Sequence, residues 1–193
     1  MPITSEPIGP TRDIRLRIES WGGRHFLALR CGIAALLLSA AIGANGQTGG
    51  TQSLLNHTAP EFVRRDLAGR SMSLARLKGK IVLLNFWATW CAPCQIEMPM
   101  FACWQRHYGP QGLAVVGISM DDDVAPVRTV MRKLRIDYPV AMGDAALGRR
   151  YGDVLALPST LLIDRNGIVR AEFEGEADLS KIEAALKNLL AGR

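Results

Sequence analysis

Two nearly continuous apolar runs, residues 80–86 and 113–119, constrain the fold of this chain more than any other feature. Neither run alternates apolar and polar side chains, and such runs are typical of strands buried on both faces of a sheet. Between them, residues 91–108 have the spacing of a helix. A strand, a helix and another strand in this order predict two parallel strands joined by a helical crossover. The residues expected on the inner side of the helix are Glu97, Phe101, Trp104 and Tyr108.

Shorter elements are predicted around this unit. Arg165-Asn166-Gly167 separates two runs of strand character, and Asn-Gly in that position is a strong signal for an antiparallel hairpin. In the last helix, Ser180 and Glu183 have the spacing of a capping box. The sequence predicts a hairpin over 62–66 and 70–73, helices over 122–134 and 145–151, strands over 138–142, 160–164 and 168–174, and a final helix from residue 179.

The order of these elements predicts one α/β domain, residues 59–193, with a mixed central sheet and helices on both faces. A β-hairpin precedes the sheet, parallel strands form its centre, and the Asn-Gly hairpin adds an antiparallel edge. We expect residues 47–58, rich in Gly, Gln, Thr and Ser, to form a linker before this domain.

The segment before the linker is apolar and uncharged. No Asp, Glu, Lys or Arg occurs in the thirty residues from Cys31 to Pro60. Residues 31–46 form the apolar part and follow a basic segment, residues 1–30, which contains five arginines. This pattern predicts a signal peptide or an uncleaved membrane anchor, with residues 1–30 in the cytoplasm and the rest of the chain exported. A buried core helix is the alternative.

Charge and composition argue against a nucleic-acid binder. The net charge is only +5, no basic run is present, and aromatic residues make up 6% of the chain. Such a chain has neither the basic patch nor the stacking surface that nucleic acids require.

The four cysteines are not spaced as a disulfide framework, but two of them form a close pair in Trp90-Cys91-Ala92-Pro93-Cys94. The pair follows a buried strand and opens a helix, where unpaired N–H groups and the helix dipole favour a thiolate. Pro93 suits the first turn because its missing N–H would have no partner there. A pair of this kind can exchange two electrons with another dithiol through a mixed disulfide. We expect Cys91, nearer the solvent, to attack and Cys94, one turn deeper, to resolve.

Three other interpretations of the pair remain open. A structural disulfide across so short a loop stabilises weakly. Half of a zinc site would need a second ligand pair, which the sequence lacks. A copper-binding module could use the soft thioethers of Met98 and Met100 and the imidazole of His107.

Other residues are ambiguous from spacing alone. Glu97 lies on the helical face of the cysteine pair, either as a solvated carboxylate or as a proton acceptor for Cys94. Asn85, in a buried run, either bonds the backbone or helps to organise the site. Pro158 precedes a strand and would ordinarily be trans. We expect Cys103 to pack as a small apolar residue, and residues 121–123 to form a solvated helix start.

With these residues in place, the sequence resembles the thioredoxin fold, and more narrowly the TlpA/ResA-like family of membrane-tethered bacterial thiol–disulfide oxidoreductases. The resemblance spans residues 59–164, and Trp-Cys-x-Pro-Cys-x-x-Glu-x-Pro is its specific motif. The Pro-x-x-x-Thr-x-x-Cys motif of peroxiredoxins is absent, since Leu84 and Ala88 occupy its first two fixed positions. The matching pieces are Ala59-Pro60-x-Phe62, Leu74-x-x-Leu77-Lys78-Gly79-Lys80, Asn85 to Cys94, Glu97-Met98-Pro99, Gly117-Ile118-Ser119 and Leu157 to Asp164.

The resemblance implies a catalytic Cys91–Cys94 disulfide, with Glu97 assisting proton transfer. It implies a cis Pro158 that faces the pair, and a family-specific insertion over residues 122–142. No cofactor or metal is implied, because the cysteine pair is itself the redox centre. The residues implied to line the substrate groove are Trp90, Ala92, Pro93, Leu157 and Pro158.

The resemblance also implies a partner and a place. Family members act on the periplasmic side of the inner membrane and reduce apocytochrome c or proteins that deliver copper to oxidases. A membrane thiol carrier supplies their electrons. The alternatives to such a reductase are a periplasmic disulfide oxidant or isomerase, and the copper-binding module.

Overall fold

The computed structural model describes residues 53–154 and 156–192. The predicted cytoplasmic segment, the predicted signal peptide or anchor, and the first part of the predicted linker lie outside these residues. Within the two described ranges, no helix combines the length and the apolar character needed to cross a membrane.

The central sheet has five strands in the order β5-β4-β3-β6-β7. The three strands on one side, β3, β4 and β5, are parallel, whereas β6 is antiparallel to both β3 and β7. This confirms the predicted mixed sheet with a parallel centre and an antiparallel edge. The strands are β3 (Ile81–Trp87), β4 (Leu113–Ser119), β5 (Val140–Met142), β6 (Ser159–Ile163) and β7 (Val169–Glu174).

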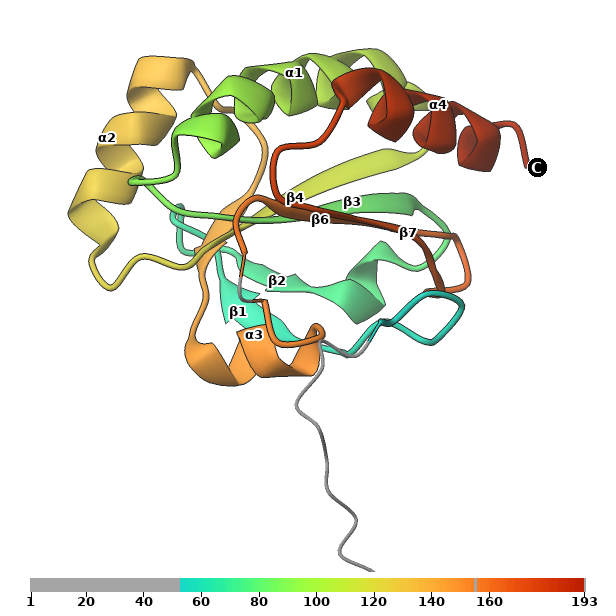
Figure 1. Ribbon diagram of the computed structural model, residues 1–193, viewed down its shortest axis with the longest axis horizontal. Coiled ribbons are helices and arrows are strands. Elements are labelled where there is room, and N and C mark those ends of the chain that lie inside the picture. Colours follow the sequence, from blue (N-terminus) through green and yellow to red (C-terminus); the bar gives the residue numbers. More distant parts are fainter. Residues whose placement is uncertain (1–52, 155, 193) are drawn as a thin grey trace, which may run out of the picture. The chain divides into compact units, whose positions relative to one another are not determined.

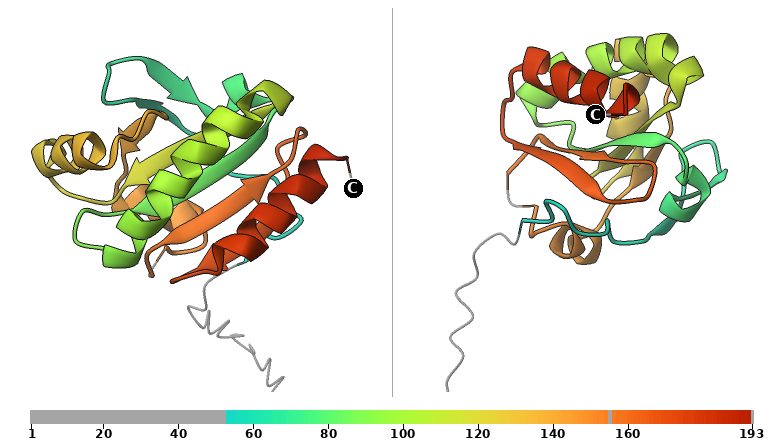
Figure 2. Two further views of the ribbon diagram at one scale, coloured as in Figure 1. Left: turned by 90° about the horizontal axis from the view of Figure 1, so that it is seen from above. Right: turned by 90° about the vertical axis from the view of Figure 1, so that its right-hand side faces the viewer.

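Helices cover both faces of the sheet, as predicted (Figure 1). One face carries α1 (Ala92–Tyr108) and α4 (Leu179–Leu190), which lie side by side in Figure 2, with α2 (Val124–Leu134) beside α1. The other face carries α3 (Ala145–Arg150) and the hairpin of β1 (Val63–Arg65) and β2 (Ser71–Ser73). Two short 3-10 helices, Leu74–Leu77 and Gly109–Gln111, complete the elements of the described residues.

Strand β3 divides the core into two layers because its side chains point alternately to opposite faces. Leu83 and Trp87 pack with the buried side chains of α1 and α4, whereas Leu84 and Phe86 pack with those of α3 and the hairpin. All seven residues of β3 are buried, and so are all seven of β4. This explains why neither sequence run alternates.

Helix α4 begins at Leu179 as predicted, but its N-cap differs from the prediction. Its N-cap is Asp178, whose side chain accepts a hydrogen bond from the N–H of Ser180 at 2.8 Å. The predicted capping box of Ser180 and Glu183 is therefore wrong: the N-cap is two residues earlier, and Ser180 lies inside the first turn. Glu183 instead accepts a hydrogen bond from the hydroxyl of Tyr108 on α1, at 2.7 Å.

Residues 53–58, assigned to the linker from the sequence, pack along β7. The N–H of Leu54 donates to the carboxylate of Glu172 at 2.6 Å, and the N–H of Asn56 donates to the carbonyl of Val169 at 2.8 Å. The packed part of the chain therefore includes Ser53, six residues before the predicted boundary at Ala59.

Candidate active site

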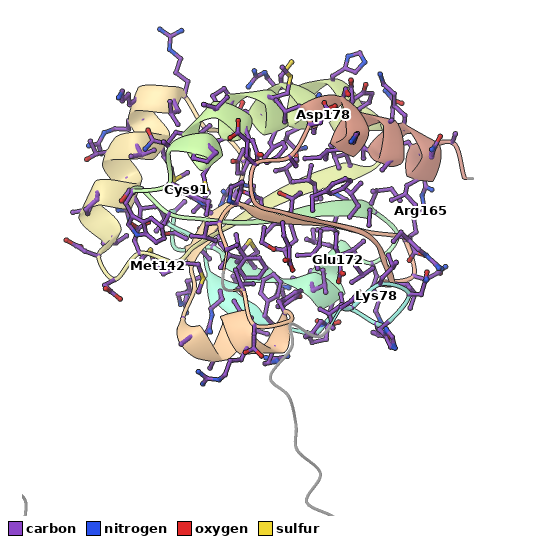
Figure 3. All side chains as sticks on the ribbon, viewed as in Figure 1. Lys78, Cys91, Met142, Arg165, Glu172 and Asp178 are labelled. Atoms are coloured by element: carbon purple, nitrogen blue, oxygen red, sulfur yellow. A yellow bond between two sulfur atoms is a disulfide. The ribbon has the colours of Figure 1, made fainter. Side chains whose placement is uncertain are left out.

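The cysteine pair lies where β3 leads into α1. Cys91 is the N-cap of α1, and its sulfur forms a disulfide of 2.03 Å with the sulfur of Cys94, one turn into the helix. Figure 3 shows Cys91 at the start of α1, on the same side of the domain as Met142 at the end of β5. The site therefore occupies the edge of the sheet at which the parallel strands end.

The two cysteines differ in exposure and in their contacts with the helix. Cys91 is 4% exposed, whereas Cys94 is fully buried. The Cys91 sulfur accepts a hydrogen bond from the backbone N–H of Cys94 at 3.3 Å, one of the donors that every helix leaves free at its N-terminus. In the reduced protein, this donor and the helix dipole favour negative charge on Cys91. The geometry fits attack by Cys91 and resolution by Cys94.

Asp121, expected from the sequence in a solvated helix start, instead holds the loop before Cys91. The carboxylate of Asp121 accepts hydrogen bonds from the N–H and hydroxyl of Thr89 and from the hydroxyl of Ser119, at 2.6–3.1 Å. Gln95 adds a bond from its side-chain amide to the carbonyl of Thr89 at 2.7 Å. Asp121 comes shortly after β4, which is parallel to β3. Because parallel strands end at the same edge of a sheet, this position in the sequence could have predicted that Asp121 lies beside the loop before Cys91.

The expected groove residues lie around the pair. Trp90 is 71% exposed, and Ala92 is also exposed. The bond between Leu157 and Pro158 is cis, as the resemblance implies. Pro158 is buried and directly precedes β6, whose Ser159 pairs with Phe86 near the end of β3. Pro158 thus lies beside the strand end from which the chain continues to Cys91.

Glu97 is buried beneath the pair rather than solvated, with only 3% of its surface exposed. Its Oε1 accepts a hydrogen bond from the N–H of Ala177 at 3.4 Å, and its Oε2 has no partner among the described residues. Burial raises the pKa of Glu97 to about 7, and the nearby charge of Glu176 contributes, while the Ala177 N–H opposes the shift. A carboxyl group with this pKa can accept a proton near neutral pH.

Asn85 lies on β3 on the face toward α1 and is fully buried. Its side-chain amide donates to the hydroxyl of Thr160 on β6 at 2.9 Å. Asn85 therefore bonds a side chain of the neighbouring strand, not only the backbone, and its oxygen has no partner among the described residues.

Cys103 lies apart from the pair. It is exposed on α1, so the predicted packing as an apolar residue is wrong, because position 103 falls on the outer side of the helix. Within the described ranges, no group of three or more His, Cys, Asp or Glu side chains could hold a metal ion.

Comparison with known proteins agrees with this geometry. A model described as "AhpC/TSA family" matches residues 55–172 of the chain. The chain belongs to this family. Among its relatives, the thiol-disulfide oxidoreductase ResA of Bacillus cereus is 33% identical over 162 residues, which cover 81% of this chain and 93% of the relative. The ResA of Bacillus subtilis is 35% identical over 147 residues, covering 74% and 82% of the two chains.

A solved structure gives the same result for the fold. A thiol:disulfide interchange protein of the thioredoxin family from Chlorobium tepidum matches with a TM-score of 0.64 and 31% identity, over 69% of this chain and 95% of that one. This AhpC/TSA family member therefore has a thioredoxin-like fold and is a ResA-like thiol–disulfide oxidoreductase with a Cys-x-x-Cys disulfide.

Proposed function

We propose that this family member reduces protein disulfides on the periplasmic side of the inner membrane, in the maturation of cytochrome c or of cytochrome oxidase. The observation that carries the proposal is the position of the Cys91–Cys94 disulfide, at the N-terminus of α1 and above the buried carboxyl group of Glu97. Similarity to ResA proteins, which are named thiol-disulfide oxidoreductases, supports thiol–disulfide exchange as the reaction.

The first step is attack by the thiolate of Cys91 on one sulfur of the substrate disulfide. A mixed disulfide forms between Cys91 and the substrate, and the other substrate sulfur leaves as a thiolate that takes up a proton. The donor N–H of Cys94 and the start of α1 favour the thiolate that begins this step.

The second step is resolution by Cys94. Glu97 takes the proton of the Cys94 thiol, and the new thiolate attacks the sulfur of Cys91. The bond between Cys91 and the substrate breaks, and the substrate leaves with its second thiol. The substrate has gained two electrons, and the protein is left with the disulfide seen here.

The surface around the pair suits a polypeptide. Trp90, Ile96 and Met100 are large apolar side chains that are exposed, and Trp90 directly precedes Cys91. Together with Ala92, Pro93, Leu157 and Pro158, they are the residues that we propose to contact the chain on either side of a substrate cysteine. We propose apocytochrome c or copper-delivery proteins as these substrates.

The sequence supports the proposed location, and the family resemblance supports the proposed electron donor. The uncharged segment over residues 31–46, behind a basic N-terminus, supports export of the domain with or without a retained anchor. A membrane thiol carrier would then return two electrons to the Cys91–Cys94 disulfide.

The reduction potential of the full chain tests the direction. We expect a value below about −200 mV, as for glutaredoxins and thioredoxin, whereas a value near about −120 mV would instead assign a periplasmic oxidant. A Cys94→Ser variant should accumulate mixed disulfides in the periplasm and so name the substrate. Tight Cu(I) binding that is lost in Cys91→Ser but kept in Cys103→Ser would support the copper-binding alternative.

A further inference from the structure

Four buried polar atoms on one face of the sheet lack hydrogen-bond partners among the described residues. They are Asn85 Oδ1, Trp87 Nε1, Glu97 Oε2 and Tyr138 Oη. Buried polar groups are almost always hydrogen-bonded, so such atoms need an explanation. The fifth unpartnered atom in the described ranges, Arg64 Nε, belongs to β1 on the opposite face.

The four atoms come from segments that meet between the sheet and α1. Asn85 and Trp87 are two residues apart on β3, so both side chains lie on the face toward α1. Tyr138 belongs to the same core cluster as Trp87 and Cys94. The rings of Trp87 and Tyr138 lie over Gly117 of β4: a Cβ at this glycine would be 3.3 Å from Trp87 Nε1 and 3.2 Å from Tyr138 Cε2. Gly117 therefore leaves the space that brings the two rings together.

Glu97 reaches the same region from α1. The pKa of Tyr138 is raised far above its ordinary value, mainly by burial, and the carboxylates of Asp137 and Glu97 add to the rise. The hydroxyl of Tyr138 therefore keeps its proton and remains a hydrogen-bond donor. Because Glu97 Oε2 and Tyr138 Oη are both buried in the layer between the sheet and α1, and neither has a partner among the described residues, a bridging water is the ordinary way to satisfy them.

The donor and acceptor count fits one water molecule. Trp87 Nε1 and the hydroxyl of Tyr138 each offer a hydrogen, whereas Glu97 Oε2 and Asn85 Oδ1 each accept one. A water molecule accepts two hydrogen bonds and donates two, so a single water complements all four groups.

We propose that Tyr138 is a positioning residue for Glu97: its hydroxyl and the indole N–H of Trp87 hold a buried water molecule that donates a hydrogen bond to the ionised carboxylate. This inference rests on the proposed role of Glu97 as the proton acceptor for Cys94. It adds that the pKa of this acceptor is tuned by Trp87 on β3 and by Tyr138 before β5, as well as by the surroundings of Glu97 on α1. Through this bond, Tyr138 stabilises the charged form of Glu97 and opposes the effects of burial and of Glu176.

The groups that face Glu97 define how a variant should behave. They are Cys94 on α1, the charge of Glu176 and the N–H of Ala177 before α4, and Tyr138 before β5. In Tyr138→Phe, the carboxylate loses a donor while every charge stays in place. The pKa of Glu97 should therefore rise, and less of its carboxylate should be ionised at neutral pH.

The resolving step can be measured by stopped flow with the reduced full chain and the small aromatic disulfide DTNB. Cys91 releases the first thionitrobenzoate, and attack by Cys94 on the mixed disulfide releases the second. We expect the rate of the second release to rise with pH through a midpoint near 7 in the unmodified chain. In Tyr138→Phe, the midpoint should move up by about one pH unit, with up to about tenfold slower release at pH 6 and an unchanged rate at pH 9.

Two controls keep the test specific. Tyr151→Phe removes a buried hydroxyl on the opposite face, where it donates to the carbonyl of Pro60, and should leave the midpoint in place. In a Glu97→Gln background, Tyr138→Phe should have no further effect on the pH profile. An unchanged midpoint in Tyr138→Phe, equal shifts in both tyrosine variants, or a shift that persists in Glu97→Gln would overturn the inference. If the midpoint shifts in Tyr138→Phe but the reduction potential is that of an oxidant, only the proposed direction of the reaction is overturned.

Discussion

The two faces of the central sheet differ in whether their most deeply buried tyrosine has a hydrogen-bond partner among the described residues. On the face of α3 and the hairpin, the buried Tyr151 packs its ring against Phe86 at 5.2 Å and donates its hydroxyl to the carbonyl of Pro60. On the face of α1 and α4, the buried Tyr138 has no such partner among the described residues, and neither does Glu97 Oε2. Both faces are close-packed, yet only the second holds the cysteine pair.

The difference separates stability from chemistry. On the first face, a hydrogen-bonded tyrosine and a closely packed phenylalanine stabilise the fold and take no part in the chemistry. The second face keeps a buried carboxyl group that is costly to ionise and is therefore suited to exchange a proton near neutral pH. We expect substitutions on the first face to change stability, and those on the second to change rates and pH dependence.

The largest effect should come from the sulfur of Cys91. Cys91→Ser should lower the rate of disulfide reduction by at least about 1000-fold, because the hydroxyl of serine cannot form the mixed disulfide. An insulin-reduction assay measures this rate. Cys103→Ser, on the exposed side of the same helix, should keep the full rate, and a comparable loss in both variants would contradict the assignment of the site.

On the opposite face, Phe86→Ala should lower the free energy of unfolding by about 3–5 kcal/mol, since it leaves a cavity beside Tyr151. Urea unfolding measures the loss. The milder Phe86→Leu should cost less. In both variants, alkylation of Cys91 in the folded, reduced protein should keep its rate, and a slower reaction would show that the two faces are not separate.

Glu97→Gln should sharpen the comparison between the two faces, because it should raise stability while it slows the resolving step by Cys94. The unfolded chain loses the Glu97 proton near pH 4.5, whereas the folded chain keeps it up to about pH 7, so stability falls as the pH rises through this window. The variant should therefore be more stable by up to about 3 kcal/mol at pH 8 and equal to the unmodified chain below pH 4. Thermal unfolding across pH gives the result, and a difference that does not vary with pH would count against the raised pKa.

The smallest effect should come from the start of α4. Asp178→Ala removes the N-cap bond to Ser180 and should cost about 1 kcal/mol. Ser180→Ala should cost less, since the hydroxyl of Ser180 is not the cap. Chemical denaturation of both variants tests the order, and a larger loss in Ser180→Ala would restore the capping box predicted from the sequence.

Much of the fold could be predicted because strong local signals coincide with tertiary structure. The uninterrupted apolar runs became β3 and β4, and Asn166-Gly167 became the turn between β6 and β7. The start of α1 at the cysteine pair could also be predicted, because strand, turn and proline all occur within a few residues.

The rest depends on neighbours that are distant in the sequence. Asp121 looks like one member of an acidic helix start until β4 brings it beside Thr89. Cys103 looks like a core residue until the outer side of α1 is known. Tyr138 looks like any strand residue until β4 and the segment before β5 bring its ring beside Trp87 over Gly117.

The proposed mechanism depends most directly on Cys91, because its position as the N-cap of α1 favours the thiolate that attacks the substrate. The decisive measurement is the alkylation rate of each cysteine in the reduced, folded full chain at pH 6, resolved by peptide mass spectrometry. We predict that Cys91 reacts at least about tenfold faster than Cys103. Equal rates for the two cysteines, with the same dependence on pH, would contradict the account.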